Sequence, residues 1–237
     1  MSQEKNPLPC PICDGTGWKW ETINGYEYVK SCECQRKRAK LNYFGEKFID
    51  STLDNYIEKN KSMRTARQAL LRKPDGSFFI YGAVNLGKTH LLAAFYEYQY
   101  KFKAKRIRVF KEATLKYELQ HSSVGSYGWR EKPKAVVSEM LEDCDAVFID
   151  DISAGITEIN DKNMNKVSME EKYLESLYVF YDTIYERKLQ LVVSSNFSLE
   201  ESERIYGARI VSRIERVCEV IEINGDADDM FTADPQV

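Results

Sequence analysis

The residues of this chain that are best suited to chemistry form one run: Gly82, Ala83, Val84, Asn85, Leu86, Gly87, Lys88, Thr89 and His90. Two glycines at this spacing, followed by Lys and Thr, are typical of a loop whose backbone N–H groups wrap a polyphosphate. Ser77–Tyr81 before the run is typical of a buried strand, and Leu91–Phe102 after it of a helix. A strand, a loop and a helix N-terminus would direct N–H groups and the positive end of the helix dipole at one point. The sequence therefore predicts a nucleoside triphosphate site.

A pair of acidic residues follows a second apolar stretch. Ala146–Ile149 is typical of a strand, and Asp150 and Asp151 come directly after it, at the end where ligands bind in parallel sheets. We expect Asp150 and the Thr89 hydroxyl to hold Mg²⁺, and Lys88 to contact the β- and γ-phosphates. Asp151 is the candidate for polarising the attacking water. The alternative is that the two acids merely end a strand.

Asn196 follows the next predicted strand, Leu189–Ser194. An amide at that position would lie beside Asp150 and could orient the water, although Asn is also a common turn residue. No Asn-Lys-x-Asp sequence is present to recognise guanine, so the expected nucleotide is ATP.

Further along, Arg209, Arg213 and Arg216 have spacings of four and three, which place them on one helical face. One interpretation is an arginine finger, a side chain that reaches the γ-phosphate held by a neighbouring subunit and neutralises charge developing there. The other is a row of surface salt bridges with Glu203 or Glu215.

A cysteine-rich segment lies near the N-terminus. It holds four of the six cysteines, as two close pairs: Cys10, Cys13, Cys32 and Cys34. In a chain with no signal-peptide core, this pattern favours a tetrahedral, structural zinc site over disulfides; the alternative is reduced structural thiols. The segment Cys10–Gly17 resembles one zinc-binding repeat of the DnaJ-type chaperones. Cys144 and Cys218 are isolated and expected in the core.

The stretch between the cysteine pairs predicts a β-hairpin. Trp18–Ile23 and Tyr26–Val29 alternate in the manner of strands, and Asn24-Gly25 is the favoured sequence of a type I′ turn. Such a hairpin would bring the two pairs together. The module is too small to fold on an apolar core, so it would need the metal for its stability.

Composition and segment order give the expected organisation. With 237 residues, 43% hydrophobic residues and a net charge of −3, the chain suits one α/β domain with a small appendage, and we expect it in the cytoplasm without a membrane segment. Alternating strands and helices predict a parallel sheet covered on both faces. The expected parts are a zinc module (1–40), a helical linker (41–74), the ATPase core (75–224) and an acidic tail (225–237). Basic clusters at Arg36–Lys40 and Lys101–Arg108 could be solvated faces or nucleic-acid contacts.

Taken together, four segments resemble the AAA+ helicase loaders of the DnaC/DnaI family: Gly82–Leu92, Ala146–Ile152, Val192–Asn196 and Gly207–Arg216. The resemblance covers most of residues 45–223. It implies an AAA+ P-loop core that self-associates, binds single-stranded DNA, hydrolyses ATP weakly and delivers a DnaB-type hexameric replicative helicase onto the strand. It also implies that residues 1–40 grip the helicase. By the same resemblance, Arg213 matches the arginine finger and Asn196 the first sensor.

The sequence departs from that family at three points. Asn85 stands where a glycine is common, although Asn tolerates a left-handed backbone better than most residues. Few residues follow the last predicted strand, Glu219–Ile223, so we expect no C-terminal helical lid and a greater role for neighbouring subunits. The N-terminal region is short, which suggests a minimal adaptor.

The resemblance places DNA contacts on helices that face the pore of a ring. The candidates are Lys111, Lys116 and Tyr117, with Tyr127 and Trp129 in the following loop, because aromatic rings beside cations suit single-strand binding. The alternative is core aromatics beside a wet charged face.

Two other functions remain open. An IstB-like AAA+ regulator of transposition would coat duplex DNA, although the zinc module argues against it. An adaptor that binds ATP with little turnover is the second.

Overall fold

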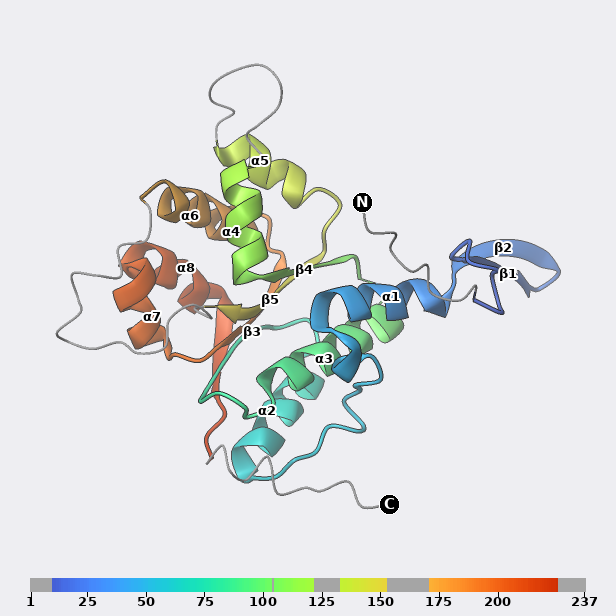
Figure 1. Ribbon diagram of the computed structural model, residues 1–237, viewed down its shortest axis with the longest axis horizontal. Helices are drawn as coiled ribbons and strands as arrows, with labels where there is room; N and C mark the ends of the chain where they lie inside the picture. The colour runs from blue at the N-terminus through green and yellow to red at the C-terminus, as the bar shows by residue number, and fades with distance from the viewer. Residues whose placement is uncertain (1–9, 104, 122–132, 153–170, 226–237) are drawn as a thin grey trace, which may run out of the picture. The chain divides into compact units, whose positions relative to one another are not determined.

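The computed structural model describes residues 10–103, 105–121, 133–152 and 171–225, and it divides into two compact units, Met1–Asp50 and Ser51–Val237 (Figure 1). The expected acidic tail and the loop with Tyr127 and Trp129 therefore lie outside the described residues, except for Gly225.

The N-terminal unit contains the predicted hairpin. Strands β1 (Trp18–Ile23) and β2 (Tyr26–Ser31) pair antiparallel, with Trp20 opposite Val29. Both turn residues have positive φ, 53° at Asn24 and 82° at Gly25, as a type I′ turn requires. Helix α1 (Glu33–Phe44) and the short 3₁₀ helix η1 (Glu46–Phe48) follow.

The larger unit is built on a parallel sheet. Its five strands have the order β4-β5-β6-β3-β7 and are β3 (Ser77–Tyr81), β4 (Ile107–Lys111), β5 (Ala146–Ile152), β6 (Gln190–Ser195) and β7 (Cys218–Glu222). All four strand pairs are parallel. The predicted α/β fold is thus confirmed. The order has a consequence for the site, because β6 lies between β3, which leads into the glycine-rich loop, and β5, which carries the two acids.

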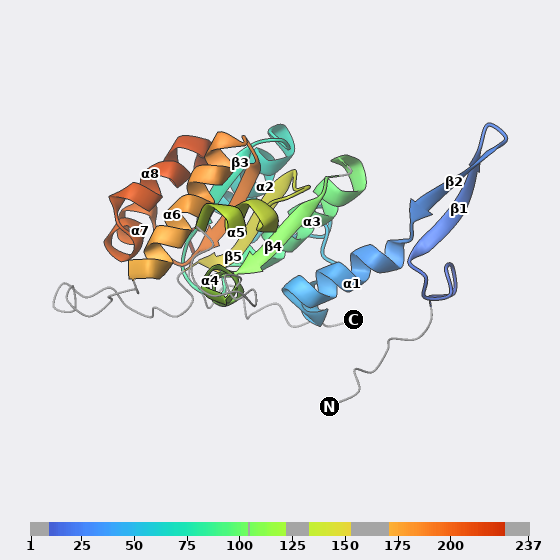
Figure 2. The same ribbon diagram turned by 90° about the horizontal axis from the view of Figure 1, so that it is seen from above.

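Helices cover both faces of the sheet. They are α2 (Lys61–Arg72), α3 (Lys88–Lys103), α4 (Glu112–His121), α5 (Pro133–Met140), α6 (Glu171–Glu186), α7 (Leu199–Tyr206) and α8 (Ala208–Val217). Helix α3 packs on β5 and β6 and α2 on β7, whereas α4 and α8 contact the sheet from the opposite face, with α5 and α6 packed against them. Figure 2 shows α5 and α6 in front of the sheet and α2 and α3 behind it. The segment expected as a linker thus contributes α2 to the larger unit.

The core follows from the alternation of side chains along each strand. Phe78 points toward α3, where its ring meets Phe95 edge-on at 6.0 Å between centroids, while Phe79 packs on the opposite face in a cluster that includes Phe180. All four rings are fully buried. Burial of one such ring stabilises the fold by about 1.5–3 kcal/mol, so both layers are held firmly against the sheet.

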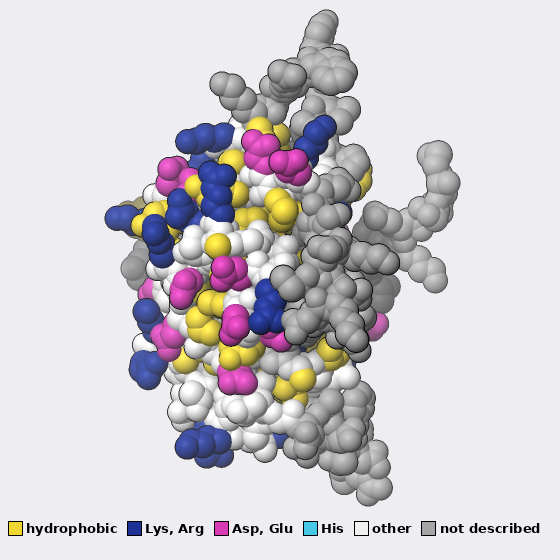
Figure 3. Space-filling view, turned by 90° about the vertical axis from the view of Figure 1, so that its left-hand side faces the viewer, with side chains coloured by type: hydrophobic (Ala, Val, Ile, Leu, Met, Phe, Trp, Pro, Cys, Tyr) yellow, Lys and Arg dark blue, Asp and Glu magenta, His cyan; other side chains and the backbone are white. Residues whose placement is uncertain are grey.

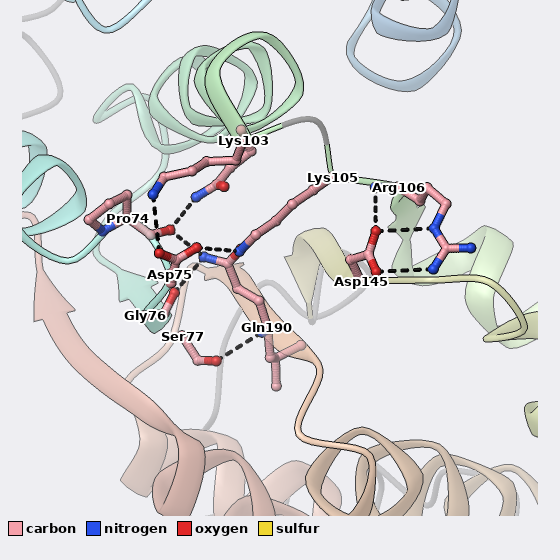
Figure 4. Close-up of polar contacts among 11 residues, drawn as sticks. Pro74, Asp75, Gly76, Ser77, Lys103, Lys105, Arg106, Asp145 and Gln190 are labelled. Carbon is pink, nitrogen blue, oxygen red and sulfur yellow. Dashed lines mark hydrogen bonds and ion pairs between the residues drawn. The ribbon is translucent and has the colours of Figure 1, made fainter.

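Three residues of the second basic cluster form ion pairs at the amino ends of the strands (Figure 4). Lys103 and Lys105 both pair with Asp75, at 3.2 and 2.9 Å, and Arg106 pairs with Asp143 at 2.9 Å and with Asp145 at 3.1 Å. These basic side chains therefore tie α3 and β4 to neighbouring turns, at the edge of the sheet opposite the glycine-rich loop.

Two strands run further than their apolar stretches. Strand β5 continues through Asp150 and Asp151, and strand β4 includes Lys111, which the resemblance had placed on a helix. In both cases the parallel ladder extends the strand, because Lys111 is in register with Asp150. None of the described helices combines the length and apolar character that crossing a bilayer requires.

Candidate nucleotide site and metal centre

The glycine-rich loop lies at the carboxyl ends of the strands, between β3 and α3. Gly82 begins it with φ of 153°, and a Cβ added there would lie 2.0 Å from the carbonyl oxygen of Ile223. The Ile223 N–H in turn donates to the carbonyl of Tyr81 at 2.7 Å. The backbone that follows β7 therefore packs directly against the start of the loop. Only glycine at position 82 leaves space for this contact.

The loop also uses left-handed backbone at two further residues, Asn85 with φ of 67° and Gly87 with φ of 76°. Asn is among the side chains that adopt this conformation with least strain. The substitution of Asn for the usual glycine at this position is therefore compatible with the loop.

Lys88, the first residue of α3, lies folded against the loop. Its Nζ donates to the carbonyls of Gly82 at 2.8 Å and Ala83 at 2.7 Å, and the residue is 7% exposed. Burial lowers the pKa of Lys88 to about 8, although the negative charges of Asp151 and Asp150 oppose this shift. The ammonium group is thus poised beside the loop, with carbonyl oxygens as its partners.

Asp150 is the centre of a hydrogen-bonded set. Its Oδ1 accepts from the Thr89 hydroxyl at 3.0 Å and from the Ser194 hydroxyl at 2.8 Å, and the residue is 4% exposed. Thr89 lies in the first turn of α3 and Ser194 on β6, so the carboxylate on β5 joins a neighbouring strand to the helix that follows the loop. A buried carboxylate facing a hydroxyl of the phosphate loop has the oxygen ligands that Mg²⁺ prefers.

Asp151 has an unusual backbone. Its φ is 58°, and the β5–β6 register shifts between Ile149 and Ile152, which marks a bulge. The N–H of Asp151 donates to Ser194 Oγ at 2.8 Å, and Oδ1 accepts from Asn196 Nδ2 at 2.9 Å. A left-handed aspartate is tolerated only where its surroundings hold it. The bulge thus turns the carboxylate toward Asn196.

The electrostatics of the acid pair reflect burial. Burial raises the pKa of Asp150 above its usual value, and the neighbouring Asp151 charge raises it further, while the Ser194 and Thr89 hydrogen bonds oppose the shift. Burial also raises the pKa of Asp151, against the charges of Lys88 and Lys111 and the Asn196 hydrogen bond. Both carboxyls therefore favour the arrival of a cation or of a proton.

His90 follows the loop and packs edge-on against Tyr56, with 5.3 Å between ring centroids. Tyr56 is 6% exposed and precedes α2. The pair ties the start of α3 to the segment before α2, so His90 shapes one wall beside the loop.

Arg213 contacts helix α6. Its Nε donates to Asp182 Oδ1 at 2.6 Å and its Nη2 to the Tyr178 hydroxyl at 3.1 Å. The expected alternatives, Glu203 and Glu215, are thus not its partners.

The DNA candidates are spread over different surroundings. Lys111 is exposed at the end of β4, where its charge acts on the acid pair. Lys116 lies over the ring of Tyr173, with Nζ 5.5 Å from the centroid, and Tyr117 is 63% exposed. Tyr117 is the aromatic residue among the three, and its exposed ring is accessible to a base.

The four N-terminal cysteines converge, as the hairpin predicted. Their sulfur atoms all lie within 4.8 Å of one another, with 3.7 Å between Cys10 and Cys32 and 3.4 Å between Cys13 and Cys34. Four sulfurs bound tetrahedrally to zinc at about 2.3 Å lie about 3.8 Å apart. The spacing therefore suits such a centre.

Backbone N–H groups face these sulfurs. The N–H of Gly17 donates to Cys13 Sγ at 3.2 Å, and the backbone of Ile12 and of Cys13 lowers the pKa of the Cys10 thiol. Such hydrogen bonds favour thiolates, the form in which cysteine binds a metal. The donor set and its surroundings therefore fit Zn²⁺.

Ser194 belongs to the site, although the sequence alone did not indicate a role for it. It is 1% exposed and touches both acids, as acceptor for the Asp151 N–H and donor to Asp150. The sequence feature that could have indicated this role is a serine near the end of an otherwise apolar strand.

A protein-family model matches most of this chain. Residues 43–220 match the model described as the bacterial DnaA ATPase domain. The chromosomal replication initiator protein DnaA of Mycoplasma genitalium is 30% identical over 188 residues, which are 76% of this chain and 37% of that protein. The chain thus spans little more than a third of the length of this curated relative.

Two solved structures have a similar fold. The DnaC helicase loader has a TM-score of 0.59 at 18% identity, over 76% of this chain and 99% of that chain. AMPPCP-bound DnaA from Aquifex aeolicus has a TM-score of 0.54 at 22% identity, over 74% of this chain and 50% of that chain. At these identities the likeness concerns the fold.

Proposed function

We propose that this chain, which belongs to the family of bacterial DnaA ATPase domains, is an ATP-dependent loader of a replicative helicase. Membership makes its core an AAA+ ATPase domain. The proposal adds that the ATPase acts as a switch: ATP assembles the chains on single-stranded DNA, and hydrolysis releases them after a DnaB-type hexameric helicase has been delivered.

The roles of the site residues follow from their contacts. The loop Gly82–Lys88 receives the triphosphate, and the Lys88 ammonium exchanges its carbonyl partners for the β- and γ-phosphates. Thr89 and Asp150, already in contact at 3.0 Å, would hold Mg²⁺, and the ion would supply positive charge to the phosphates. The buried neighbourhood of Asp150 makes that charge compensation strong.

Asp151 and Asn196 act on the water. The carboxylate accepts a proton as the water attacks, and the amide, 2.9 Å from Asp151 Oδ1, fixes the orientation of that carboxylate. Arg213, whose own contacts lie on α6, is the arginine finger for the nucleotide of a neighbouring subunit, as the resemblance to helicase loaders implies. Turnover is therefore slow in separate chains and faster in assemblies.

The observation that carries the loader proposal is the N-terminal unit. Its hairpin exposes Trp18 by 55% and Trp20 by 71%, and these two alternate residues share one face of β1 with the cross-strand neighbour Val29. Exposed tryptophans are typical anchors of protein interfaces. Zinc held by the four cysteines would make the hairpin rigid. The hairpin would then lose less conformational entropy when it binds a helicase.

Binding of the full chain to the replicative helicase of the encoding replicon tests this proposal. We expect co-elution with the helicase hexamer, and its loss in a Trp18→Ser, Trp20→Ser double variant. Lys19→Gln is the matched control, because Lys19 lies between the tryptophans on the opposite face of the hairpin. Absence of binding by the unaltered chain would contradict the loader role, while binding by the double variant would contradict the docking surface alone.

Single-stranded DNA is the second proposed partner. Tyr117, with its exposed ring, would stack on a base, and Lys116 and Lys111 would contact phosphates. Tyr117→Ala should weaken single-strand binding by a stacking contribution of about 1–3 kcal/mol. An unchanged affinity would remove Tyr117 from the DNA surface.

A second candidate function is assembly on DNA during initiation itself. The 30% identity to a chromosomal replication initiator protein favours it. In that role the chain would assemble on DNA in the presence of ATP, so ATP-dependent assembly on DNA by a chain that does not co-elute with the helicase would favour this second function.

A further inference from the structure

The arginine row of α8 faces a matching row on α6. Arg209 and Arg213 are four residues apart on α8, and Tyr178 and Asp182 are four residues apart on α6. The guanidinium carbon of Arg209 lies 3.9 Å from the centroid of the Tyr178 ring, and that of Arg213 lies 5.5 Å from the same centroid. Each arginine therefore contacts a side chain one helix away.

The hydrogen bonds around Arg213 form a closed set. Asp182 Oδ1 accepts from Arg213 Nε at 2.6 Å and from the Tyr178 hydroxyl at 3.5 Å, and that hydroxyl accepts from Arg213 Nη2 at 3.1 Å. Both members of the Arg213–Asp182 pair are partly shielded, with side-chain exposures of 22% and 28%. A charged pair in such surroundings holds its geometry better than a fully exposed one.

One edge of the guanidinium group is left over. Among the described residues, Nη1 of Arg213 makes no hydrogen bond, whereas Nε and Nη2 are both engaged. The planar fork is thus fixed in direction with one donor end available. A finger that is already oriented loses little conformational freedom when it meets a phosphate.

We propose that Tyr178 and Asp182 are positioning residues that orient Arg213 toward the nucleotide of a second copy of this chain. This inference rests on the part of the proposed function that makes Arg213 an arginine finger. Asp182 fixes the Nε edge, Tyr178 fixes Nη2 and supports the guanidinium plane, and Nη1 is presented to the γ-phosphate of the neighbour. Arg209, whose guanidinium carbon is 3.9 Å from the centroid of the Tyr178 ring, holds that ring in place.

The charge distribution on the surface around α6, α7 and α8 is compatible with a specific contact between Arg213 and the nucleotide of a neighbouring chain. Figure 3 views the molecule from the side on which α6, α7 and α8 lie, and it shows Lys and Arg side chains interspersed with acidic and hydrophobic ones. A surface of mixed charge gives weak general attraction for polyanions, so recognition would depend on the placement of individual groups.

A double-mutant cycle on ATP turnover tests the proposal. ATP turnover per chain is measured for the entire chain of 237 residues, at increasing concentrations until the turnover no longer rises. We expect Asp182→Ala to lower this plateau about tenfold to a hundredfold, as misplacement of a catalytic group does, with unchanged ATP affinity and unchanged melting temperature. In an Arg213→Ala background, Asp182→Ala should have no further effect, because the two act as one unit.

Two variants complete the cycle. Glu175→Gln is the matched control, since Glu175 is an exposed acid of the same helix, and it should leave turnover unchanged. Asp182→Asn, which keeps an acceptor for Nε, should recover part of the loss.

The outcomes separate the inference from its premise. A plateau in Asp182→Ala equal to that of the unaltered chain, or an equal loss in both backgrounds, would overturn the positioning role. Normal turnover in Arg213→Ala would overturn the finger itself and with it this inference. Failure to bind a helicase, with the cycle behaving as expected, would contradict only the loader role.

Mixed assemblies give a second readout. Lys88→Ala chains cannot bind phosphate well but still donate Arg213, so they should restore turnover to Arg213→Ala chains. Lys88→Ala, Asp182→Ala chains should restore it poorly. Equal restoration by both would contradict the proposal.

Discussion

The side-chain amide of Asn196 donates a hydrogen bond of 2.9 Å to Oδ1 of Asp151, across the boundary between two neighbouring strands. It joins the residue proposed to act on water to the end of β6, the strand that lies between the phosphate loop and the acids. The amide therefore fixes which carboxylate oxygen is free to face the water.

The first prediction concerns this contact. Asn196→Ala should lower the rate of ATP hydrolysis about tenfold to a thousandfold, the range for loss of one positioned polar group, while the dissociation constant for ATP changes little. Single-turnover hydrolysis and equilibrium nucleotide binding are the measurements. A large loss of affinity with an unchanged hydrolysis rate would place Asn196 in nucleotide binding instead.

The second prediction concerns Ser194. Its hydrogen bond lowers the pKa of Asp150 against the effect of burial, so Ser194→Ala should raise that pKa further. Because Mg²⁺ binding needs the ionised carboxylate, turnover should begin to fall at a higher pH as the solution is acidified. The loss of a buried partner should also cost about 1–3 kcal/mol of stability.

The matched control for Ser194 is its neighbour Ser195. It is also fully buried, but its hydroxyl oxygen accepts from the Phe197 N–H, and among the described residues it forms no hydrogen bond with either acid. Ser195→Ala should leave the acid limb of the pH profile where it is. Equal shifts in both variants would show that the effect is a general loosening of β6.

The third prediction is a pH dependence of nucleotide binding. Burial lowers the pKa of Lys88 to about 8 in the free protein. A phosphate-bound lysine must be charged, so affinity for ATP should be level below about pH 8 and should fall up to about tenfold per pH unit above it. Lys88→Arg, which does not titrate in this range, should bind with little change between pH 7.5 and 9.5. A parallel decline in both proteins would exclude Lys88 as the cause.

The fourth prediction concerns the cysteine cluster. The purified chain should contain about one zinc ion, and Cys13→Ser should lose it, whereas Cys144→Ser should keep it. Chelation should disorder the hairpin, seen as a change in tryptophan fluorescence, because the metal supplies the stability that a small core lacks. ATP affinity should stay within about twofold, since the nucleotide site lies in the other unit. Full zinc content in Cys13→Ser would rule out the proposed ligand set.

Sequence reasoning located the parts of the site that local pattern determines. The glycine-rich loop, the acid pair and the Asn24-Gly25 turn depend on residues that are adjacent in the chain. For that reason the positive φ at Asn85 and the convergence of the cysteines could be expected beforehand.

Contacts of the site between residues far apart in the sequence could not be predicted from local patterns. Ser194 meets Asp150 across 44 positions because β6 is inserted between β3 and β5, and no local pattern gives that strand order. Arg213 meets Asp182 through the register of α8 on α6. The basic residues Lys103–Arg106 looked available to nucleic acid until Asp75 and Asp145 were brought beside them by the fold.

Delivery of the replicative helicase onto closed circular single-stranded DNA tests the central claim most directly. The chain, its helicase, ATP and a circular strand with one annealed oligonucleotide are mixed, and displacement of the oligonucleotide is measured. We expect displacement that depends on the chain and on ATP, and that is lost with Lys88→Ala and with the Trp18→Ser, Trp20→Ser variant. Displacement at the same rate without the chain, or with the Lys88→Ala chain, would contradict it.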